Sequence, residues 1–172
     1  MNLILRPERA GDAPLIEAVT ATAFAGAAHA THTEQHIVSA LRSAGQRALS
    51  LLAQDLDTVI GHVAASPVTV SDGAAGWFGL GPLSVAPHYQ RRGVGSRLVP
   101  EALRELRAQG ARGCVVLGEP DYYSRFGFRA DPALVLPGVR AGYFQVLAFA
   151  TPPPRGSVAY AAAFTAARPA AR

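Results

Sequence analysis

The sequence predicts one domain of the α/β class. Three observations support this prediction. Short apolar runs rich in β-branched residues alternate along the chain with segments whose apolar residues recur at helical spacing. Over residues 82–98 a strand pattern, a tight glycine-bearing turn and a helix start follow one another directly. The chain has 172 residues, of which 49% are hydrophobic, so it can bury one substantial core and is too apolar to be disordered.

The N-terminal part is predicted as a strand followed by two helices. Residues 3–5 form the strand, and a helix capped by Asp12 runs on through Phe24. Residues 33–42 carry apolar side chains on one helical face, and Thr33 is the cap of that helix.

Three strands are predicted next. Residues 48–53 and 58–70 form a hairpin around a turn at residues 55–57. Residues 77–85 form the fourth strand. Because this strand contains glycines and a proline, we expect it to be bulged or splayed and to leave backbone groups unpaired.

A long helix is predicted over residues 94–109. Its apolar residues fall on one face, and Gly110 ends it. Pro100 lies inside this helix and removes one backbone hydrogen bond, so we expect a bend near the second turn.

Two more strands complete the predicted elements. Residues 113–118 form a short apolar strand, and residues 143–150 form the last strong one. The prolines at 152–154 end that strand, and we expect an extended tail to begin there. Residues 165–172 are rich in Ala, Arg and Pro and are expected to fray.

Composition excludes several classes of protein. The net charge of +4 comes from scattered arginines, and the absence of a basic run argues against nucleic acid. The single cysteine, Cys114, lies in an apolar run, which indicates a core residue in a reducing compartment. The chain shows no signal peptide, no apolar stretch of ~18 residues and no metal-ligand spacing. We therefore expect a soluble, cytoplasmic protein that binds no nucleic acid, membrane or metal.

The most informative segment is the turn between the fourth strand and the long helix. Gly93 and Gly95 allow the backbone to come close to a ligand, and turn amides followed by a helix N-terminus favour an anion. Arg91 and Arg92 add positive charge at the same place. This combination predicts a loop that binds a diphosphate.

Two well-known phosphate loops do not match this turn. A Walker loop has four residues between its glycines and then Gly-Lys-Ser/Thr, whereas Gly93 and Gly95 are separated by one residue and no lysine follows. A dinucleotide fingerprint needs a third glycine where Leu98 stands.

The pattern Gln/Arg-x-x-Gly-x-Gly/Ala of residues 90–95 resembles the acyl-CoA pyrophosphate loop of the GNAT superfamily of N-acetyltransferases. Residues 123–128 read Tyr-x-x-x-Gly-Phe and are similar to the GNAT helix and exit turn after the fifth strand. Residues 80–85 and the terminal Gly-x-Val-x-Tyr-x-x-Ala-Phe segment, residues 156–164, resemble one bacterial subgroup of small GNAT enzymes. The resemblance therefore covers a single domain over residues 1–164.

This resemblance implies a more specific fold and a co-substrate. The fold has a central mixed, mostly antiparallel sheet of about six or seven strands, splayed between the fourth and fifth, and about four helices. Acetyl-CoA is the implied co-substrate, without a metal. Its pantetheine arm would bond free backbone groups at Leu83, Ser84 and Val85. Its pyrophosphate would lie on the loop residues Gln90, Arg91, Arg92, Gly93, Val94, Gly95 and Ser96.

The implied reaction is direct acyl transfer to an amine. The amine attacks the thioester carbonyl, a base or a water chain removes the ammonium proton and an acid protonates the leaving thiolate. The resemblance makes Tyr123 the acid, with core packing as the alternative, and makes the Val85 N–H the donor that polarises the carbonyl. The carboxylate that many GNAT enzymes carry on the fourth strand is missing here. The base is therefore open between Glu34 and Glu119, either of which could instead be a solvated surface residue.

The acceptor is the least defined part of the prediction. In GNAT enzymes the region of residues 26–32 usually shapes the acceptor pocket, and here it is small and weakly polar, with His29 and His32 available to relay protons. Because no acidic cluster would attract a polycation, a small-molecule or peptide amine with a neutral body is favoured.

Two alternatives stay open at this point. The missing carboxylate is compatible with an acyl-CoA-binding or sensing module without catalysis. A homodimer is also open, because Trp77, Phe144 and Phe149 could line an interface as well as a core.

Overall fold

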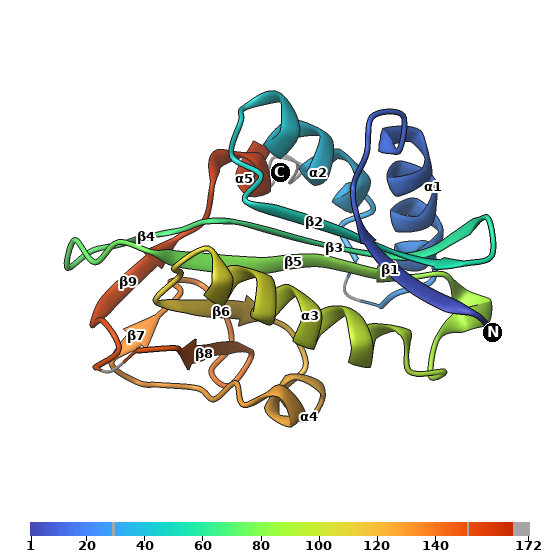
Figure 1. The fold of residues 1–172 in the computed structure, drawn as a ribbon. Coiled ribbons are helices and arrows are strands. Elements are labelled where there is room, and N and C mark those ends of the chain that lie inside the picture. The colour runs from blue at the N-terminus through green and yellow to red at the C-terminus, as the bar shows by residue number, and fades with distance from the viewer. Residues whose placement is uncertain (29, 151, 167–172) are drawn as a thin grey trace.

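The computed structural model describes residues 1–28, 30–150 and 152–166 and confirms the α/β class (Figure 1). The helices are α1 (Ala13–Phe24), α2 (Glu34–Ser43), α3 (Val94–Ala108), α4 (Pro120–Tyr123) and α5 (Ala162–Ala166), with 3-10 turns η1 (Pro87–Tyr89) and η2 (Ser124–Phe126). The strands are β1 (Leu3–Pro7), β2 (Leu49–Asp55), β3 (Thr58–Pro67), β4 (Thr69–Val70), β5 (Trp77–Val85), β6 (Gly113–Leu117), β7 (Leu134–Val135), β8 (Phe144–Ala148) and β9 (Gly156–Ala159).

The central sheet has six strands in the order β1-β2-β3-β5-β6-β8. All neighbouring strands are antiparallel except β5 and β6, which are parallel. A second, three-stranded sheet has the order β4-β9-β7. The predicted mixed, mostly antiparallel sheet is therefore confirmed.

The expectation of an extended tail after the prolines at 152–154 is wrong. β9 pairs with β4 on one side and with β7 on the other, and α5 follows it. Of the segment expected to fray, Thr165 belongs to α5, and residues 167–172 lie outside the described residues.

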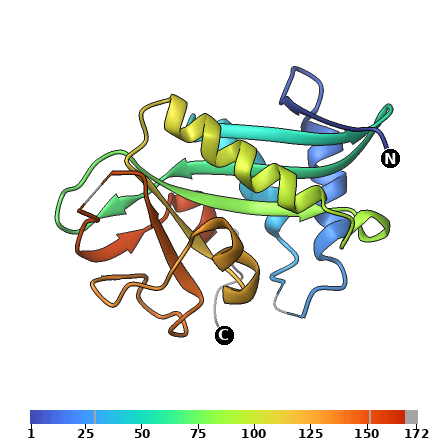
Figure 2. The same cartoon turned by 60° about the horizontal axis from the view of Figure 1, so that its bottom comes forward.

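Helices cover both faces of the central sheet. In Figure 1 α1, α2 and α5 lie on one side of the sheet and α3 on the other. Figure 2 shows α3 lying across β2, β3 and β5. The largest core lies beneath α3, because the apolar face of this helix is buried against the sheet, whereas Pro100 is on its exposed side. The buried residues of that face include Leu98, Ala102, Leu103 and Leu106.

The aromatic residues considered for an interface serve the interior. Trp77 and Phe144 are buried in a second core with residues of β4, β6 and β9. Phe149 packs partly against the main core, and the Arg107 guanidinium lies 4.4 Å from the centre of its ring.

The structure corrects two predicted helix caps. Asp12 precedes α1, but its carboxylate accepts hydrogen bonds from the Arg6 guanidinium at 2.6 and 2.9 Å and from Arg9 N–H at 2.6 Å instead of capping the helix. Thr33 precedes α2, but its hydroxyl pairs with that of Thr31 at 2.8 Å. In both places the side chain found another polar partner that sequence spacing does not reveal.

The parting of the fourth and fifth long strands is present. β5 pairs with β6 at three residues only: Trp77, Phe78 and Gly79 stand opposite Gly113, Cys114 and Val115 of β6. Past Gly79, β5 continues beside β3 alone, with a register shift where its glycine and proline stand, while β6 stays paired with β8. The chain thus leaves a gap between β5 and β6 that opens toward the end of β5.

Within the described part of the chain, the helices are too short or too polar to cross a membrane.

Candidate active site

The predicted pyrophosphate loop connects the end of β5 to the start of α3. Arg91 and Gly93 both have positive φ, at 59° and 85°, so the loop turns tightly and directs successive amides to one side. Gly93 immediately precedes α3, and no side chain among the described residues caps this 15-residue helix. The amides of its first turn are therefore free for an anion at the positive end of the helix dipole.

Gln90 ties this loop to the strand. Its side-chain amide donates a hydrogen bond to Val85 O at 3.0 Å. Tyr89 N–H donates to Ala86 O at 2.8 Å, and the Arg92 guanidinium lies 5.6 Å from the centre of the Tyr89 ring. These contacts hold the loop against the end of β5, while both loop arginines keep exposed side chains.

The gap leaves one backbone edge of β5 without a strand partner. Ala86 N–H donates to Ile60 O of β3 at 2.8 Å. Because backbone groups alternate between the two sides of a strand, Ser84 also turns toward β3, whereas Leu83 and Val85 turn toward the gap. Of the three residues predicted to bind pantetheine, Leu83 and Val85 therefore present N–H and C=O groups to the gap.

Tyr123 ends α4 and sits on Gly118, the residue after β6. A Cβ atom at Gly118 would overlap the Tyr123 ring and would lie 3.0 Å from its Cδ2. The ring also contacts Tyr122 and Phe128 edge-on, with centroids 5.0 and 5.9 Å away. Burial raises the pKa of Tyr123 above its usual value of 10, with smaller contributions from Tyr122 and Cys114. The phenol is therefore protonated at neutral pH.

Gly95 makes room for Tyr122. A Cβ atom at Gly95 would overlap the Tyr122 hydroxyl oxygen. The Arg125 guanidinium stacks on the other side of this tyrosine, 4.5 Å from the ring centre. The two tyrosines of α4 thus lie together at the open end of the gap, Tyr122 beside the start of α3 and Tyr123 beside the end of β6.

The two candidate bases differ in their surroundings. Glu34 is 8% exposed at the start of α2, and its Oε1 accepts hydrogen bonds from Thr31 N–H at 2.6 Å and from the Thr31 hydroxyl at 3.0 Å. Its Oε2 is buried and has no hydrogen-bond partner among the described residues. Glu119 is exposed. His32 is exposed as well, and His29 lies outside the described residues.

Cys114 is buried beneath α3, as predicted for a core residue. Burial raises the pKa of its thiol to about 12, so this side chain is not a nucleophile at neutral pH.

The structure also shows polar groups that sequence reasoning did not single out. Buried side-chain atoms without a hydrogen-bond partner in the described part of the chain include Tyr160 Oη, Ser66 Oγ and Gln145 Nε2. Tyr160 is the tyrosine of the terminal motif, so the motif itself was the available signal. Ser66 and Gln145 stand in apolar strand segments that carry no motif. Across residues 1–28, 30–150 and 152–166, no group of three potential ligands could hold a metal ion.

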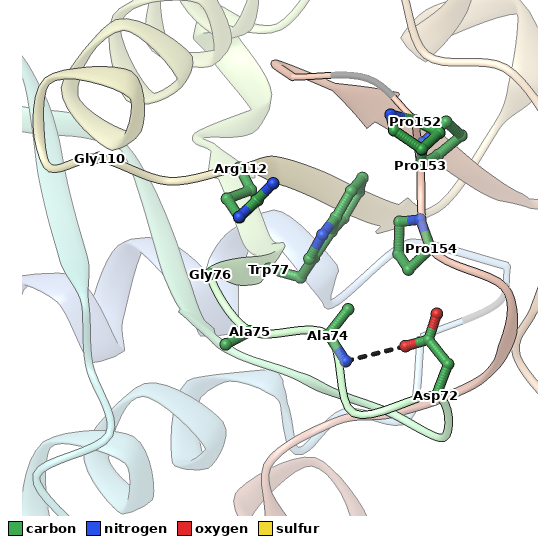
Figure 3. A pocket seen from close by; sticks show the side chains of 10 residues that line it. All are labelled: Asp72, Ala74, Ala75, Gly76, Trp77, Gly110, Arg112, Pro152, Pro153 and Pro154. Atoms are coloured by element: carbon green, nitrogen blue, oxygen red, sulfur yellow. Dashed lines mark hydrogen bonds between the residues drawn. The ribbon is translucent and has the colours of Figure 1, made fainter.

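A surface hollow at another place in the molecule does not coincide with this site. A cavity of about 560 Å³ lies at the other end of β5, beside Trp77 and Arg112 and under the prolines at 152–154 (Figure 3). The loop follows the last residue of the nine-residue β5, about 26 Å further along the strand at 3.3 Å per residue. We therefore assign the candidate site to the gap and the loop rather than to this cavity.

Comparison with known proteins identifies the family of the chain. The model of the acetyltransferase (GNAT) family matches residues 16–128. The uncharacterized N-acetyltransferase YhbS of Escherichia coli (strain K12) is 39% identical over 127 residues, which cover 73% of each chain.

Solved structures extend this likeness over nearly the whole chain. A GNAT family acetyltransferase from Brucella melitensis in complex with acetyl-CoA is 46% identical, with a TM-score of 0.85 and 95% of this chain and 98% of that one covered. The structure of YhbS from Escherichia coli in complex with CoA is 34% identical, with a TM-score of 0.86 and 95% and 92% covered. Together these matches show that the chain belongs to the GNAT family of acetyltransferases and is an acyltransferase enzyme.

Proposed function

We propose that this protein transfers the acetyl group of acetyl-CoA to a primary amine, by direct attack of the amine in a ternary complex. The observation that carries the proposal is the unpaired backbone edge of β5, which runs directly into a glycine-bearing loop at a helix N-terminus. The complexes of the Brucella melitensis and Escherichia coli relatives with acetyl-CoA and CoA support the same co-substrate.

The residues present suit the chemical parts of acetyl-CoA. The free amides from Gly93 to Ser96 and the exposed Arg91 and Arg92 would bind the pyrophosphate. The amide-rich pantetheine arm would take the place of a strand beside Leu83 and Val85, whose backbone groups face the gap. Gln90 would hold the loop in place through Val85 O rather than through the ligand.

Bound acetyl-CoA supplies an activated acetyl group as a thioester. The N–H of Val85 points into the gap and would donate to the thioester carbonyl oxygen as negative charge develops there, and the N–H of Leu83 is a second donor on the same edge. Tyr123 holds its proton on Oη at neutral pH and would donate it toward the sulfur when the carbon–sulfur bond breaks and the carbon–nitrogen bond forms.

Between the two candidate bases we favour Glu34. Its buried Oε2 is an acceptor without a partner in the described residues, whereas the Glu119 side chain is exposed to solvent. A base at Glu34 would receive the proton that the attacking nitrogen loses, on the side of the sheet covered by α1 and α2.

The test is release of free CoA from acetyl-CoA in the presence of defined amines. The panel comprises 2-phenylethylamine, spermidine, glycine, kanamycin and a peptide with a free N-terminus. We expect turnover of at least one of them. Tyr123→Phe should lose most of this turnover while its acetyl-CoA affinity, measured by calorimetry, stays unchanged.

The matched control is Tyr143→Phe, a half-buried tyrosine in the segment before β8 whose ring stacks on Arg140. This variant should keep full turnover. Tight acetyl-CoA binding without turnover across the whole panel would contradict the proposal and favour an acyl-CoA-binding or sensing module. Unchanged acetyl-CoA affinity in Arg91→Ala would contradict the assignment of the loop.

A further inference from the structure

The terminal motif contains a tyrosine, Tyr160, whose ring packs against β5. A Cβ atom at Gly79 would overlap Cε1 of the Tyr160 ring and would lie 3.0 Å from its Cδ1, so only glycine leaves room for this ring. On its other side the Tyr160 ring meets Phe164, with centroids 5.1 Å apart. Gly79 and Phe164 thus fix the position of the ring.

The hydroxyl of this tyrosine is buried without a partner in the described part of the chain. The same is true of the Ser66 hydroxyl, and Ser66 is fully buried. Ser66 of β3 stands directly opposite Gly79 of β5, so its side chain leaves the sheet on the face where the Tyr160 ring lies. Two hydroxyl groups without a hydrogen-bond partner therefore lie on the same face of the sheet, beside the pair of Ser66 and Gly79.

That area lies at the closed end of the gap. Gly79 is the last residue of β5 that pairs with β6, so the strands separate immediately beyond it. The loop that would bind the pyrophosphate is at the opposite, open end. A cofactor lying along β5 therefore directs its reacting end toward Gly79 and Tyr160.

The hydroxyl of Tyr160 also lies near the proposed acid. Burial raises the pKa of Tyr160, and the neighbouring Cys114 and Tyr123 add to this effect. Tyr123 rests on the residue after β6 and packs against the main core, whereas Tyr160 rests on β5 and packs against the second core, so the two rings lie on opposite faces of the sheet. Both remain protonated and uncharged at neutral pH.

A buried hydroxyl without a partner favours a polar ligand, because leaving the hydroxyl unpaired costs free energy. The methyl group of an acetyl group cannot form the missing hydrogen bond. The nitrogen of a neutral amine can donate to the oxygen of one hydroxyl and accept from another. β5 carries no carboxylate that would instead hold a charged ammonium group. The Tyr160 and Phe164 rings and Val68 supply an apolar surround.

We infer that Tyr160, with Ser66 beside it, binds the nitrogen of the acceptor and selects a primary amine carried on an apolar body. This inference rests on the proposed function and names the acceptor class for the same site. According to this inference, the terminal motif forms the end of the gap that binds the acceptor.

The test uses Tyr160→Phe, which keeps the ring and removes only the hydroxyl. The substrate is the panel amine that the unaltered protein turns over fastest. We expect kcat/KM for this amine to fall about tenfold, mainly through a higher KM, because the variant loses one hydrogen bond to the amine. Acetyl-CoA affinity should stay unchanged. In the absence of ligand, Tyr160→Phe should raise Tm by about 2–4 °C, because it removes an unpaired buried hydroxyl. If the Tyr160 hydroxyl instead made a hydrogen bond within the protein, its removal would lower Tm.

Gly79→Ala is the second variant, because its methyl group displaces the ring, and it should reduce kcat/KM for the amine at least as strongly. Tyr143→Phe again serves as the control and should change neither kcat/KM nor Tm. Unchanged amine kinetics in Tyr160→Phe, a lower Tm, or a preference for spermidine over 2-phenylethylamine would overturn the inference while leaving the acetyltransferase itself intact. Absence of turnover in the unaltered protein would instead overturn the proposed function.

Discussion

Acidification should destabilise this protein through one histidine, His62. Its side chain is fully buried in β3, and its Nε2 lies 2.7 Å from Ser50 Oγ. Ser50 donates its hydroxyl proton to the Glu8 carboxylate, so the serine oxygen accepts from His62 Nε2–H. The Nδ1 atom is left unprotonated, buried and without a partner among the described residues. A second proton on this ring would therefore have no acceptor.

The size of this effect follows from the pKa of the histidine. Burial lowers the pKa of His62 from 6.5 to about 4, against the opposing attraction of Glu8 and with smaller help from Arg42 and Arg47. Below pH 6.5 the unfolded chain binds a proton that the folded protein does not bind until about pH 4. Stability is therefore full above pH 6.5 and falls as the pH drops to about 4. At about 1.4 kcal/mol for each pH unit, the total loss is about 3.5 kcal/mol.

The assay is urea unfolding at a series of pH values, with His62→Gln as the control. The glutamine variant should be less stable near neutral pH, because it disturbs the Ser50 contact, but its stability should be nearly flat from pH 6.5 to about 4.5. Below 4.5 both proteins lose stabilisation from Glu8, because its burial is outweighed by hydrogen bonds with Arg42 and Ser50, which lower its pKa. The carboxylate of Asp12, whose pKa the Arg6 guanidinium lowers to about 2, loses its stabilisation only below 3.8 and so does not mask the histidine. Parallel curves for the two proteins would refute the reasoning.

Two further predictions concern the loop and the acid. Gly93→Ala and Gly110→Ala both place a Cβ atom at a φ near +85°, with no neighbouring atom within 4 Å. Each variant should therefore lose about 1 kcal/mol of stability. Only Gly93→Ala should weaken acetyl-CoA binding, as measured by calorimetry. Equal affinities of the two variants would contradict the loop assignment. Because burial raises the pKa of Tyr123 above 10, the rate of CoA release should not fall as pH rises toward 10, and a decline that begins near pH 9 and is absent from Tyr123→Phe would contradict this.

Local patterns in the sequence predicted most of the fold. The strands and α3 follow from apolar periodicity, and the irregular β5 follows from its own glycines and proline. The predictions failed where the partner is distant in sequence. The Asp12 carboxylate accepts a hydrogen bond from Arg6 of β1 instead of capping α1. β9 looked like a tail, because its short run becomes a strand only beside β4 and β7.

The candidate site divides in the same way. The loop is a continuous segment, so its positive φ values at Arg91 and Gly93 could be anticipated from residue types. The buried carboxylate of Glu34 could not, because the first residue of a helix is usually solvated and its burial depends on distant packing. The contact of Tyr160 with Gly79 joins the terminal motif to a strand far away in the sequence, and no local pattern predicts such a contact.

The short parallel contact between β5 and β6 also has a consequence for how the molecule opens. Hydrogen bonds between strands join the first part of the chain to the last at only two places, three residues between β5 and β6 and two residues between β4 and β9, as far as the described residues show. The segment carrying β6 and β8 should therefore exchange its amide hydrogens through local opening, at lower free energy than global unfolding. A co-substrate lying in the gap would bridge both walls and turn two weakly joined units into one cooperative unit.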